Sequence, residues 1–255
     1  MNRSRPTQIF AHRGANREAA ENTRTAFDRS LAYPIDGIET DIQLTRDGVA
    51  VLWHDRFLDK LGLKDKRIDD FDLAELRAMD FAAHFGGPIR EGIATLQEFL
   101  DAYRTRCRLL LEIKNRAWER AERHEAKVRQ TLELVGAANG DQVLVSSFNL
   151  DSLIFAHRIR PDFPQVYNLE PEHDAAYARE VLDAQPFLHG LCVHIDTLDE
   201  AMVGAVRERG KSIAVYTCNS DEEIACALDL GVDILISDVP QKALALRERM
   251  EQKHA

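Results

Sequence analysis

Seven ionisable side chains, drawn from separate parts of the sequence, are of the types that hold cations, bind anions and transfer protons. Each one lies within or soon after a short apolar run, where a buried strand would end and open into a pocket. One such residue alone is most simply a surface group. Seven at neighbouring strand ends would repel or desolvate one another unless a metal ion and an anion neutralised them. The set comprises His12, Arg13, Glu39, Asp41, His54, Glu112 and Lys114.

The carboxylates of this set predict a cation site. Glu39 and Asp41 are two residues apart on one predicted strand, so their side chains lie on the same strand face, and Glu112 lies on another predicted strand. Three carboxylates without a Cys ligand or a His-x-His pair make a hard oxygen site. We therefore expect one divalent cation, Mg²⁺ or Ca²⁺, rather than zinc.

The remaining four side chains favour phosphodiester cleavage around that cation. Arg13 and Lys114 would hold phosphate oxygens, while the cation offsets charge that develops in the transition state. His12 and His54 would transfer protons on the two sides of phosphorus, one from the attacking hydroxyl and one to the leaving alkoxide. The residues leave open whether water or a hydroxyl of the substrate attacks first.

The elements that would position these side chains alternate along the chain. Eight short apolar runs are separated by segments with helical spacing, a pattern typical of a parallel (β/α)8 TIM barrel. Two helices have predicted N-terminal caps, one at Asn22 or Thr23 and one at Thr95, where Glu98 would complete a capping box. The predicted strands are 8–11, 37–44, 108–114, 142–148, 164–169, 190–195, 212–217 and 233–238.

Residues 45–95 break the alternation. The stretch "TDIQLTRDGVAVLWHD" predicts a hairpin around the pair Asp47-Gly48, which would place residue 54 opposite residue 39 and so bring His54 beside Glu39 and Asp41. A charged segment and the short helix "FDLAELRAMD" follow. We interpret residues 45–95 as an insertion between the second strand and the second helix, at the carboxyl end of the barrel. We expect residues 1–255 to form a single α/β domain.

Composition narrows the choice of partners. Hydrophobic residues make up 45% of the chain and the net charge is −10, which favours a globular protein and argues against nucleic acid or an anionic membrane surface as partners. The start "MNRSRPTQIF" has no apolar leader, and no run of apolar residues is long enough for an integral membrane segment. We expect a cytoplasmic protein with four reduced cysteines and a small-molecule substrate; its oligomeric state cannot be read from these patterns.

Several motifs together resemble a known family. "AHRG" followed by "ENT", then "GIETDIQLTRDGVAVLWHD", "TLQEFL", "LLEIK", "SSFN", "VYTCN" and "GVDILISDVP", are similar in content and order to motifs of the glycerophosphodiester phosphodiesterases, from residue 9 to about residue 240. The resemblance implies a barrel of the phospholipase-C-like phosphodiesterase type. It also implies metal-dependent hydrolysis of glycerophosphodiesters to glycerol 3-phosphate and an alcohol, in glycerophospholipid degradation.

The resemblance also implies a role for each residue of the set. His12 and His54 correspond to the acid–base pair, and Arg13 and Lys114 to phosphate contacts. The metal ligands correspond to Glu39, Asp41 and Glu112.

One position departs from the family pattern. The tryptophan usual before T-x-N is here Tyr216. This aromatic residue is expected to pack on the alcohol part of the substrate. The change leaves the preferred head group open, but the expected reaction is the same. Phe148, in "SSFN", is expected either to form another wall of that pocket or to be ordinary core.

Other functions fit the sequence less well. A sphingomyelinase D or lysophospholipase D relative is disfavoured by the absence of a secretion signal and disulfides and by the "GVDILISDVP" ending. A catalytically silent barrel that binds a phosphodiester or a protein would be expected to have lost His12 or Glu112. A zinc amidohydrolase would need a His-x-His pair on the first strand, where this chain has His12, Arg13 and Gly14.

Overall fold

The computed structural model of the chain describes residues 6–116, 119–137, 140 and 142–254. Residues 1–5, which begin the stretch considered above as a leader, lie outside the described residues.

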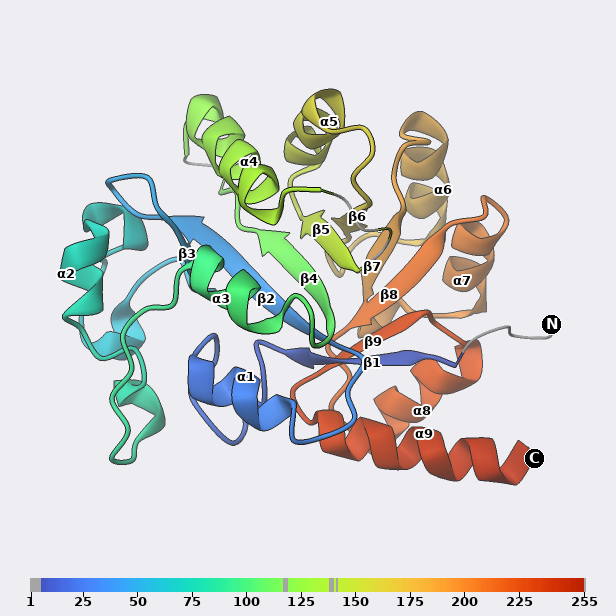
Figure 1. Cartoon of the computed structure of the whole chain (residues 1–255). Helices are drawn as coiled ribbons and strands as arrows, with labels where there is room; N and C mark the ends of the chain where they lie inside the picture. Colours follow the sequence, from blue (N-terminus) through green and yellow to red (C-terminus); the bar gives the residue numbers. More distant parts are fainter. Residues whose placement is uncertain (1–5, 117–118, 138–139, 141, 255) are drawn as a thin grey trace.

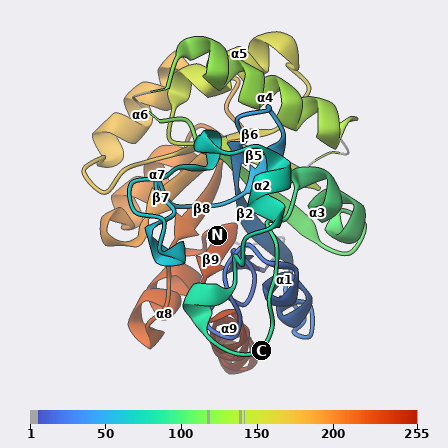
Figure 2. The same ribbon diagram turned by 90° about the vertical axis from the view of Figure 1, so that its left-hand side faces the viewer.

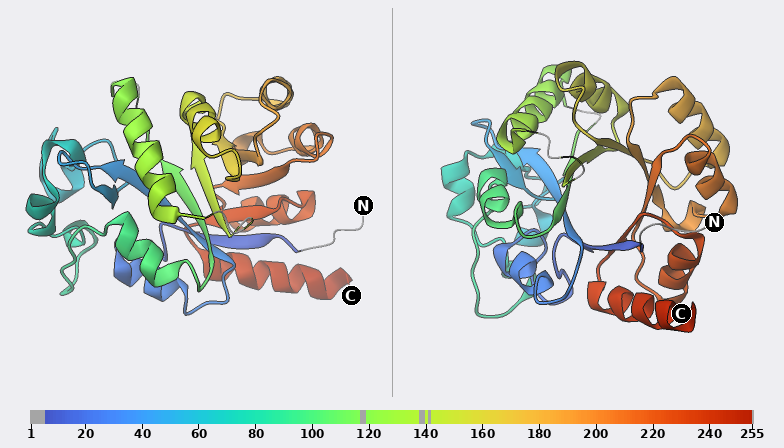
Figure 3. Two further views of the ribbon diagram at one scale, coloured as in Figure 1. Left: turned by 45° about the horizontal axis from the view of Figure 1, so that its top comes forward. Right: turned by 45° about the vertical axis from the view of Figure 1, so that its right-hand side comes forward.

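Eight parallel strands close into a barrel (Figure 3). They are β1 (Gln8–His12), β2 (Gly37–Leu44), β4 (Arg108–Ile113), β5 (Val143–Ser147), β6 (Gln165–Asn168), β7 (Gly190–His194), β8 (Ser212–Tyr216) and β9 (Ile234–Ser237). β1 pairs with β2 on one side and with β9 on the other, which closes the ring. Each predicted strand is confirmed to within one residue at either end.

Helices between the strands cover the outside of the barrel (Figure 1). They are α1 (Arg24–Ser30), α3 (Leu96–Tyr103), α4 (Ala121–Val135), α5 (Leu150–Ile159), α6 (Ala175–Ala184), α7 (Glu200–Arg207), α8 (Asp221–Leu230) and α9 (Pro240–His254). Of the helices in the described ranges, none combines the length and apolar character that a membrane crossing needs.

Apolar side chains fill the inside of the barrel. Phe10, Leu110, Leu144 and Ile236 belong to one buried cluster contributed by the inward faces of the strands. This layer lies below the polar side chains at the carboxyl ends of the strands. It therefore gives any cavity at that end an apolar floor.

The helix caps agree with the sequence in one case and correct it in the other. Thr95 caps α3 and forms the predicted capping box with Glu98. The cap of α1 is Thr23, whose side chain accepts a hydrogen bond from the N–H of Ala26, so the prediction of Thr23 as a capping residue is confirmed and that of Asn22 is wrong. Asn22 has a positive φ of 57°, and its side chain is engaged in the active-site region described below.

The insertion lies at the carboxyl end of the barrel, where it has a small core of its own. Figure 2 looks onto that end, with the insertion in front of the strands. Its buried cluster includes Trp53, Leu58 and Phe81. Its elements are the short strand β3 (Ala50–Leu52), the short helix α2 (Leu73–Arg77) and three 3₁₀ turns, η1 (Asp59–Leu61), η2 (Ile68–Asp70) and η3 (Ala83–Phe85).

The predicted hairpin exists, but its register differs by one residue. β2 and β3 are antiparallel and pair Ile42 with Leu52, so a continued ladder would place residue 54 opposite residue 40 rather than residue 39. A two-residue loop at Asp47-Gly48 would place residue 54 opposite residue 41, so loop length alone does not account for the difference from residue 39. The N–H of Thr45 bonds to the carbonyl of Val49 at 3.0 Å, leaving a three-residue loop whose last residue, Gly48, has a φ of +80°.

Gly14 turns the chain from β1 into the next loop at very close range to α1. Its φ is +81°, and a Cβ placed there would lie 2.6 Å from the carbonyl carbon of Ala26. Gly48 has a similar φ, yet a Cβ there would meet nothing within 4 Å. The close approach expected of Gly14 from the sequence is thus present, and Gly48 offers a matched position without it.

We predict that Gly14→Ala destabilises the fold more than Gly48→Ala. Both changes pay for an L side chain at positive φ, about 1–2 kcal/mol, and Gly14→Ala adds an overpacking cost of about 1–3 kcal/mol. Urea unfolding followed by circular dichroism measures both. Equal losses in the two variants would contradict the packing role of Gly14.

Candidate active site

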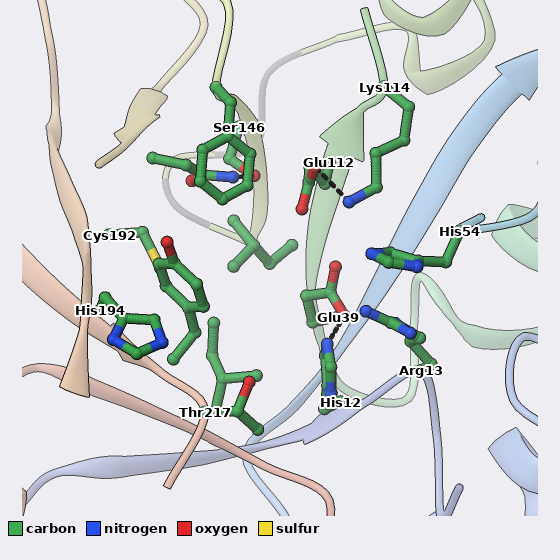
Figure 4. Close-up of a pocket in the computed structure, with 15 residues that line it drawn as sticks. His12, Arg13, Glu39, His54, Glu112, Lys114, Ser146, Cys192, His194 and Thr217 are labelled. Atoms are coloured by element: carbon green, nitrogen blue, oxygen red, sulfur yellow. Dashed lines mark hydrogen bonds and ion pairs between the residues drawn. The ribbon is translucent and has the colours of Figure 1, made fainter. Parts of the chain in front are cut away.

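A cavity of about 270 Å³ opens at the carboxyl end of the barrel. Figure 4 shows the predicted charged residues gathered on one side of it and Ser146, Cys192 and His194 on the other. Leu110 and Ile236 belong to its apolar floor. The predicted residues that line it are His12, Arg13, Glu39, His54, Glu112, Lys114, Phe148 and Tyr216. Asp41, the remaining one, is completely buried beside them.

Three carboxylates form a tight buried cluster on the charged side. One ligand oxygen from each of Glu39, Asp41 and Glu112 lies within 4.8 Å of the others. Burial, followed by the charge of Asp41, raises the pKa of Glu39 well above its usual value. A cation among these oxygens would offset both effects, and an all-carboxylate donor set suits hard divalent ions. The residues present therefore fit the cation that the sequence predicts.

Two basic side chains offset part of this negative charge. The Lys114 Nζ lies 2.9 Å from Asp41 Oδ1 and also forms an ion pair with Glu112, while the Arg13 Nε lies 3.1 Å from Asp41 Oδ2. Burial alone would raise the pKa of Asp41, but the charges of Lys114 and Arg13 bring it well below its usual value. Both cations thus lie at the edge of the carboxylate cluster, as an anion-binding role requires.

Asn22 fixes the orientation of Asp41. Its amide Nδ2 donates to Asp41 Oδ2 at 2.9 Å, and its Oδ1 accepts from the Thr40 hydroxyl at 2.7 Å. All three side chains are buried. An oriented carboxylate is what a metal ligand needs from its surroundings.

Asp238 orients the first histidine. His12 Nδ1 lies 2.6 Å from Asp238 Oδ1, and His12 Nε2 lies 3.8 Å from Glu39 Oε2. Burial acts to raise the pKa of Asp238, but its hydrogen bond with His12 and that from Asn16 help bring it below the usual value, so it is an acceptor. His12 therefore carries its proton on Nδ1 and presents a bare Nε2 beside Glu39.

His12 is also poised to be neutral. Burial and then the charge of Arg13 lower its pKa from the usual value, and they outweigh the opposing effect of Asp238. A neutral imidazole with an unprotonated Nε2 can accept a proton.

An ionic chain connects the second histidine to Arg13. His54 Nδ1 lies 2.8 Å from Asp55 Oδ1, and the Lys60 Nζ lies 2.8 Å from both Asp55 Oδ2 and Glu21 Oε1. Glu21 Oε2 in turn lies 3.1 Å from Arg13 Nη1. Glu21, His54 and Asp55 are close enough to hold a metal, but the Lys60 ammonium already contacts both carboxylates. This series of ion pairs holds the insertion against the loop after β1.

Backbone contacts also hold His54 in place after β3. Gln43 Nε2 donates to the carbonyls of Trp53 at 2.8 Å and Asp55 at 2.9 Å. Arg116 donates to the carbonyl of His54 at 2.7 Å. These bonds explain why His54 lines the same cavity as Glu39 in spite of the shifted hairpin register.

Aromatic side chains form the opposite side of the cavity. The Phe148 and Tyr216 rings meet edge to face with centroids 5.6 Å apart, and the Tyr216 and His194 rings do so at 5.3 Å. The Tyr216 hydroxyl donates to the carbonyl of Leu169 at 2.6 Å. Its hydroxyl is thus satisfied by the protein, and it is the ring that is left to contact a substrate. The structure places both predicted aromatic residues at the cavity, while their effect on substrate choice stays a prediction.

Several residues that support the site were missed in the sequence. Asp238 lies directly after the last strand in "ISDVP", the position at which functional groups occur in such barrels. Asn22 lies in the "ENT" motif but was interpreted only as a cap. Glu21 also lies in the "ENT" motif, but no role was assigned to it, and Lys60 carried no signal, because nothing in its spacing indicates that the insertion folds back onto the first loop.

Fold and site together define a (β/α)8 barrel enzyme whose ionisable groups converge at the carboxyl ends of its strands. The model of the Glycerophosphoryl diester phosphodiesterase family matches residues 12–242. The chain belongs to this family.

Individual relatives and solved structures are similar to this chain along almost its whole length. It is 32% identical over 254 residues to a glycerophosphodiester phosphodiesterase of Bacillus altitudinis, covering 96% of this chain and 100% of the relative. Among solved structures, it is similar to an Oleispira antarctica phosphodiesterase in complex with the product sn-glycerol-3-phosphate, with a TM-score of 0.85, 27% identity and coverage of 95% and 97% of the two chains. A Thermotoga maritima glycerophosphodiester phosphodiesterase shares the fold, with a TM-score of 0.77, 23% identity and coverage of 96% and 100%.

We predict that Asp238→Asn lowers kcat by about 10²- to 10⁴-fold, because an amide can donate to Nδ1 and favour the wrong tautomer of His12. Steady-state kinetics on a phosphodiester measures the loss. Asp221→Asn, which changes an exposed carboxylate paired with Lys242 at 2.7 Å, is the matched control and should leave kcat unchanged. Near-normal kcat in Asp238→Asn would show that the contact with His12 is structural only.

Proposed function

We propose that this protein hydrolyses glycerophosphodiesters, such as the deacylated products of glycerophospholipid breakdown, to glycerol 3-phosphate and an alcohol. The observation that carries the proposal is the meeting of two imidazoles, two cationic side chains and three carboxylates at one cavity. The family match and the product bound in the Oleispira antarctica relative support the substrate class.

A single divalent cation, Mg²⁺ or Ca²⁺, completes the proposed site. Glu39, Asp41 and Glu112 would hold it. When bound, such a cation supplies positive charge that stabilises the transition state of a phosphodiester.

Arg13 and Lys114 would position the phosphate. Both side chains are largely buried and reach the cavity beside the carboxylate cluster. Burial acts to lower the pKa of Lys114, but the charges of Asp41 and Glu112 raise it above the usual value, so it is a cation at neutral pH. Such cations bind the non-bridging oxygens of a phosphodiester through charge-assisted hydrogen bonds.

The two histidines would transfer the protons. His12 Nε2, bare and neutral, accepts the proton of the attacking hydroxyl as its oxygen forms a bond to phosphorus. His54, held through Nδ1 by Asp55, donates a proton to the alcohol oxygen as the bond from phosphorus to that oxygen breaks. Asp238 and Asp55 keep each ring in the required orientation.

A panel of glycerophosphodiesters tests the proposed function. Chelated and metal-repleted enzyme is incubated with glycerophosphocholine, glycerophosphoethanolamine and glycerophosphoglycerol, and glycerol 3-phosphate is measured. Release of glycerol 3-phosphate by the repleted enzyme supports the proposal. No release from any diester, with bis(p-nitrophenyl) phosphate still cleaved, would assign the site to another phosphodiester.

We predict that Glu39→Gln raises the Mg²⁺ or Ca²⁺ concentration for half-maximal activity by at least about tenfold, because the amide keeps the shape but loses the charge that holds the ion. Activity is titrated against metal after chelation and desalting. Glu18→Gln, at a partly buried carboxylate that accepts a hydrogen bond from the Tyr33 hydroxyl and does not line the cavity, is the control. An unchanged half-saturating concentration in Glu39→Gln would remove Glu39 from the metal site.

We predict that His12→Ala and His54→Ala each lower kcat by about 10²- to 10⁴-fold on an alkyl diester, the usual worth of a positioned acid or base. Circular dichroism should show that both variants remain folded. The loss from His54→Ala should shrink on a diester with a p-nitrophenol leaving group, which departs without a proton. The same loss on both substrates would contradict the role of His54 as the acid.

A further inference from the structure

The side of the cavity opposite the carboxylates contains a buried polar group that the reaction described above does not use. Asn168, at the end of β6, lines the cavity and is only 5% exposed. Its Nδ2 makes one long bond of 3.5 Å to the Ser146 hydroxyl. Its Oδ1 is buried without a hydrogen-bond partner among the described residues. Leaving such a buried acceptor unpaired is unfavourable.

The neighbours of Asn168 make this side of the cavity suited to an uncharged hydroxyl. Ser146 is buried beside it, and His194 lies on the same side (Figure 4). The N–H of Asp196 donates to His194 Nδ1 at 3.2 Å, so the neutral ring carries its proton on Nε2. Asn168 offers an acceptor, and the Ser146 hydroxyl and the His194 ring offer donors. No Lys or Arg side chain lines the cavity from β5, β6, β7 or β8 in the described residues.

The depth of Asn168 decides which part of a diester it can reach. Asn168 follows Val166 of the barrel interior on the same strand face, and it pairs with Cys192 in the sheet. It therefore lies low in the cavity, just above the apolar floor. The phosphate must lie near Arg13 and Lys114, so the part of the substrate that enters the cavity faces Asn168, while the other part extends toward the opening.

We propose that Asn168, supported by Ser146, forms a subsite in which its Oδ1 accepts a hydrogen bond from a hydroxyl of the substrate's glycerol. The inference rests on the proposed function and adds a specificity-determining residue to it. The glycerol half, which is common to all substrates of the proposed class, is bound inside the cavity. The variable alcohol lies near the opening.

The test compares substrates with and without glycerol hydroxyls. Wild-type, Asn168→Leu and Asn168→Ser enzymes are assayed on glycerophosphocholine, on its analogues lacking one or the other glycerol hydroxyl, and on bis(p-nitrophenyl) phosphate, which has no glycerol. We expect kcat/KM for glycerophosphocholine to fall about tenfold more than kcat/KM for bis(p-nitrophenyl) phosphate in both variants. Removing the recognised hydroxyl from the substrate should cost much less in the variants than in the wild type, as a double-mutant cycle requires.

A binding measurement gives a second readout. The inhibition constant of glycerol 3-phosphate should rise about tenfold in the variants, while that of inorganic phosphate changes much less. Gln130→Leu is the matched control: Gln130 is a partly buried amide on α4 whose Oε1 also lacks a hydrogen-bond partner in the described chain, but it does not line the cavity. It should change neither ratio. Asn168→Ser keeps a polar side chain on β6 and serves if the leucine variant fails to fold.

The outcomes separate the two proposals. If wild-type enzyme cleaves bis(p-nitrophenyl) phosphate but no glycerophosphodiester, the proposed function fails before any variant is compared. If wild-type enzyme cleaves both, and the Asn168 variants lose activity equally on both and bind the two anions with equal loss, then Asn168 only supports packing and the inference is overturned. Unequal losses in the stated direction support it.

Discussion

The site depends on the burial of three carboxylates at the carboxyl end of the barrel, with one oxygen of each within 4.8 Å of the others. Glu39, Asp41 and Glu112 are each at most 8% exposed, and close burial of like charges is strongly unfavourable without compensation. Arg13 and Lys114 compensate part of the charge, and a divalent cation would compensate the rest. Other polar contacts around the cavity hold these side chains in place. One of them is the hydrogen bond that the Asn22 amide donates to Asp41.

The two halves of the barrel contribute different kinds of side chains to the cavity. β1, β2, β4, the residues directly after them and the insertion carry the charged groups and the two histidines proposed to transfer protons, while β5 to β8 carry aromatic and uncharged polar groups. The charged half is tied together by Asp238 under His12 and by Lys60 between Glu21 and Asp55. Among the described residues, the lining of the other half has no Lys, Arg, Asp or Glu side chain, as suits a surface that recognises shape and hydroxyl groups rather than charge.

The strands and the main charged residues could be predicted because their signals are local. Each strand is a short apolar run; Glu39 and Glu112 lie within such runs and His12 directly follows one, at the end where a barrel opens. The pair Asp47-Gly48 indicated the hairpin but not its register: residue 54 would face residue 41 across a two-residue loop, and it faces residue 40 across the observed three-residue loop, which the bond between Thr45 and Val49 closes. An Asn before a helix can cap that helix or bind a side chain elsewhere in the protein. Only the fold shows that Asp41 is near enough for Asn22 to bind it.

Contacts between distant segments were beyond the reach of sequence patterns. Asp238 meets His12 because β9 pairs with β1 to close the barrel, and the unpaired oxygen of Asn168 exists only as a consequence of burial. Lys60 joins two loops whose approach is set by the packing of the insertion.

The most direct test of the central claim is a joint titration of metal binding and activity. Chelated enzyme is titrated with Mg²⁺ or Ca²⁺, bound ion is counted by calorimetry, and the hydrolysis of glycerophosphoethanolamine is followed by ³¹P NMR at each point. The account predicts one ion bound per chain, with glycerol 3-phosphate release rising in proportion to the occupied fraction. Full release of glycerol 3-phosphate from enzyme that binds no ion would contradict it.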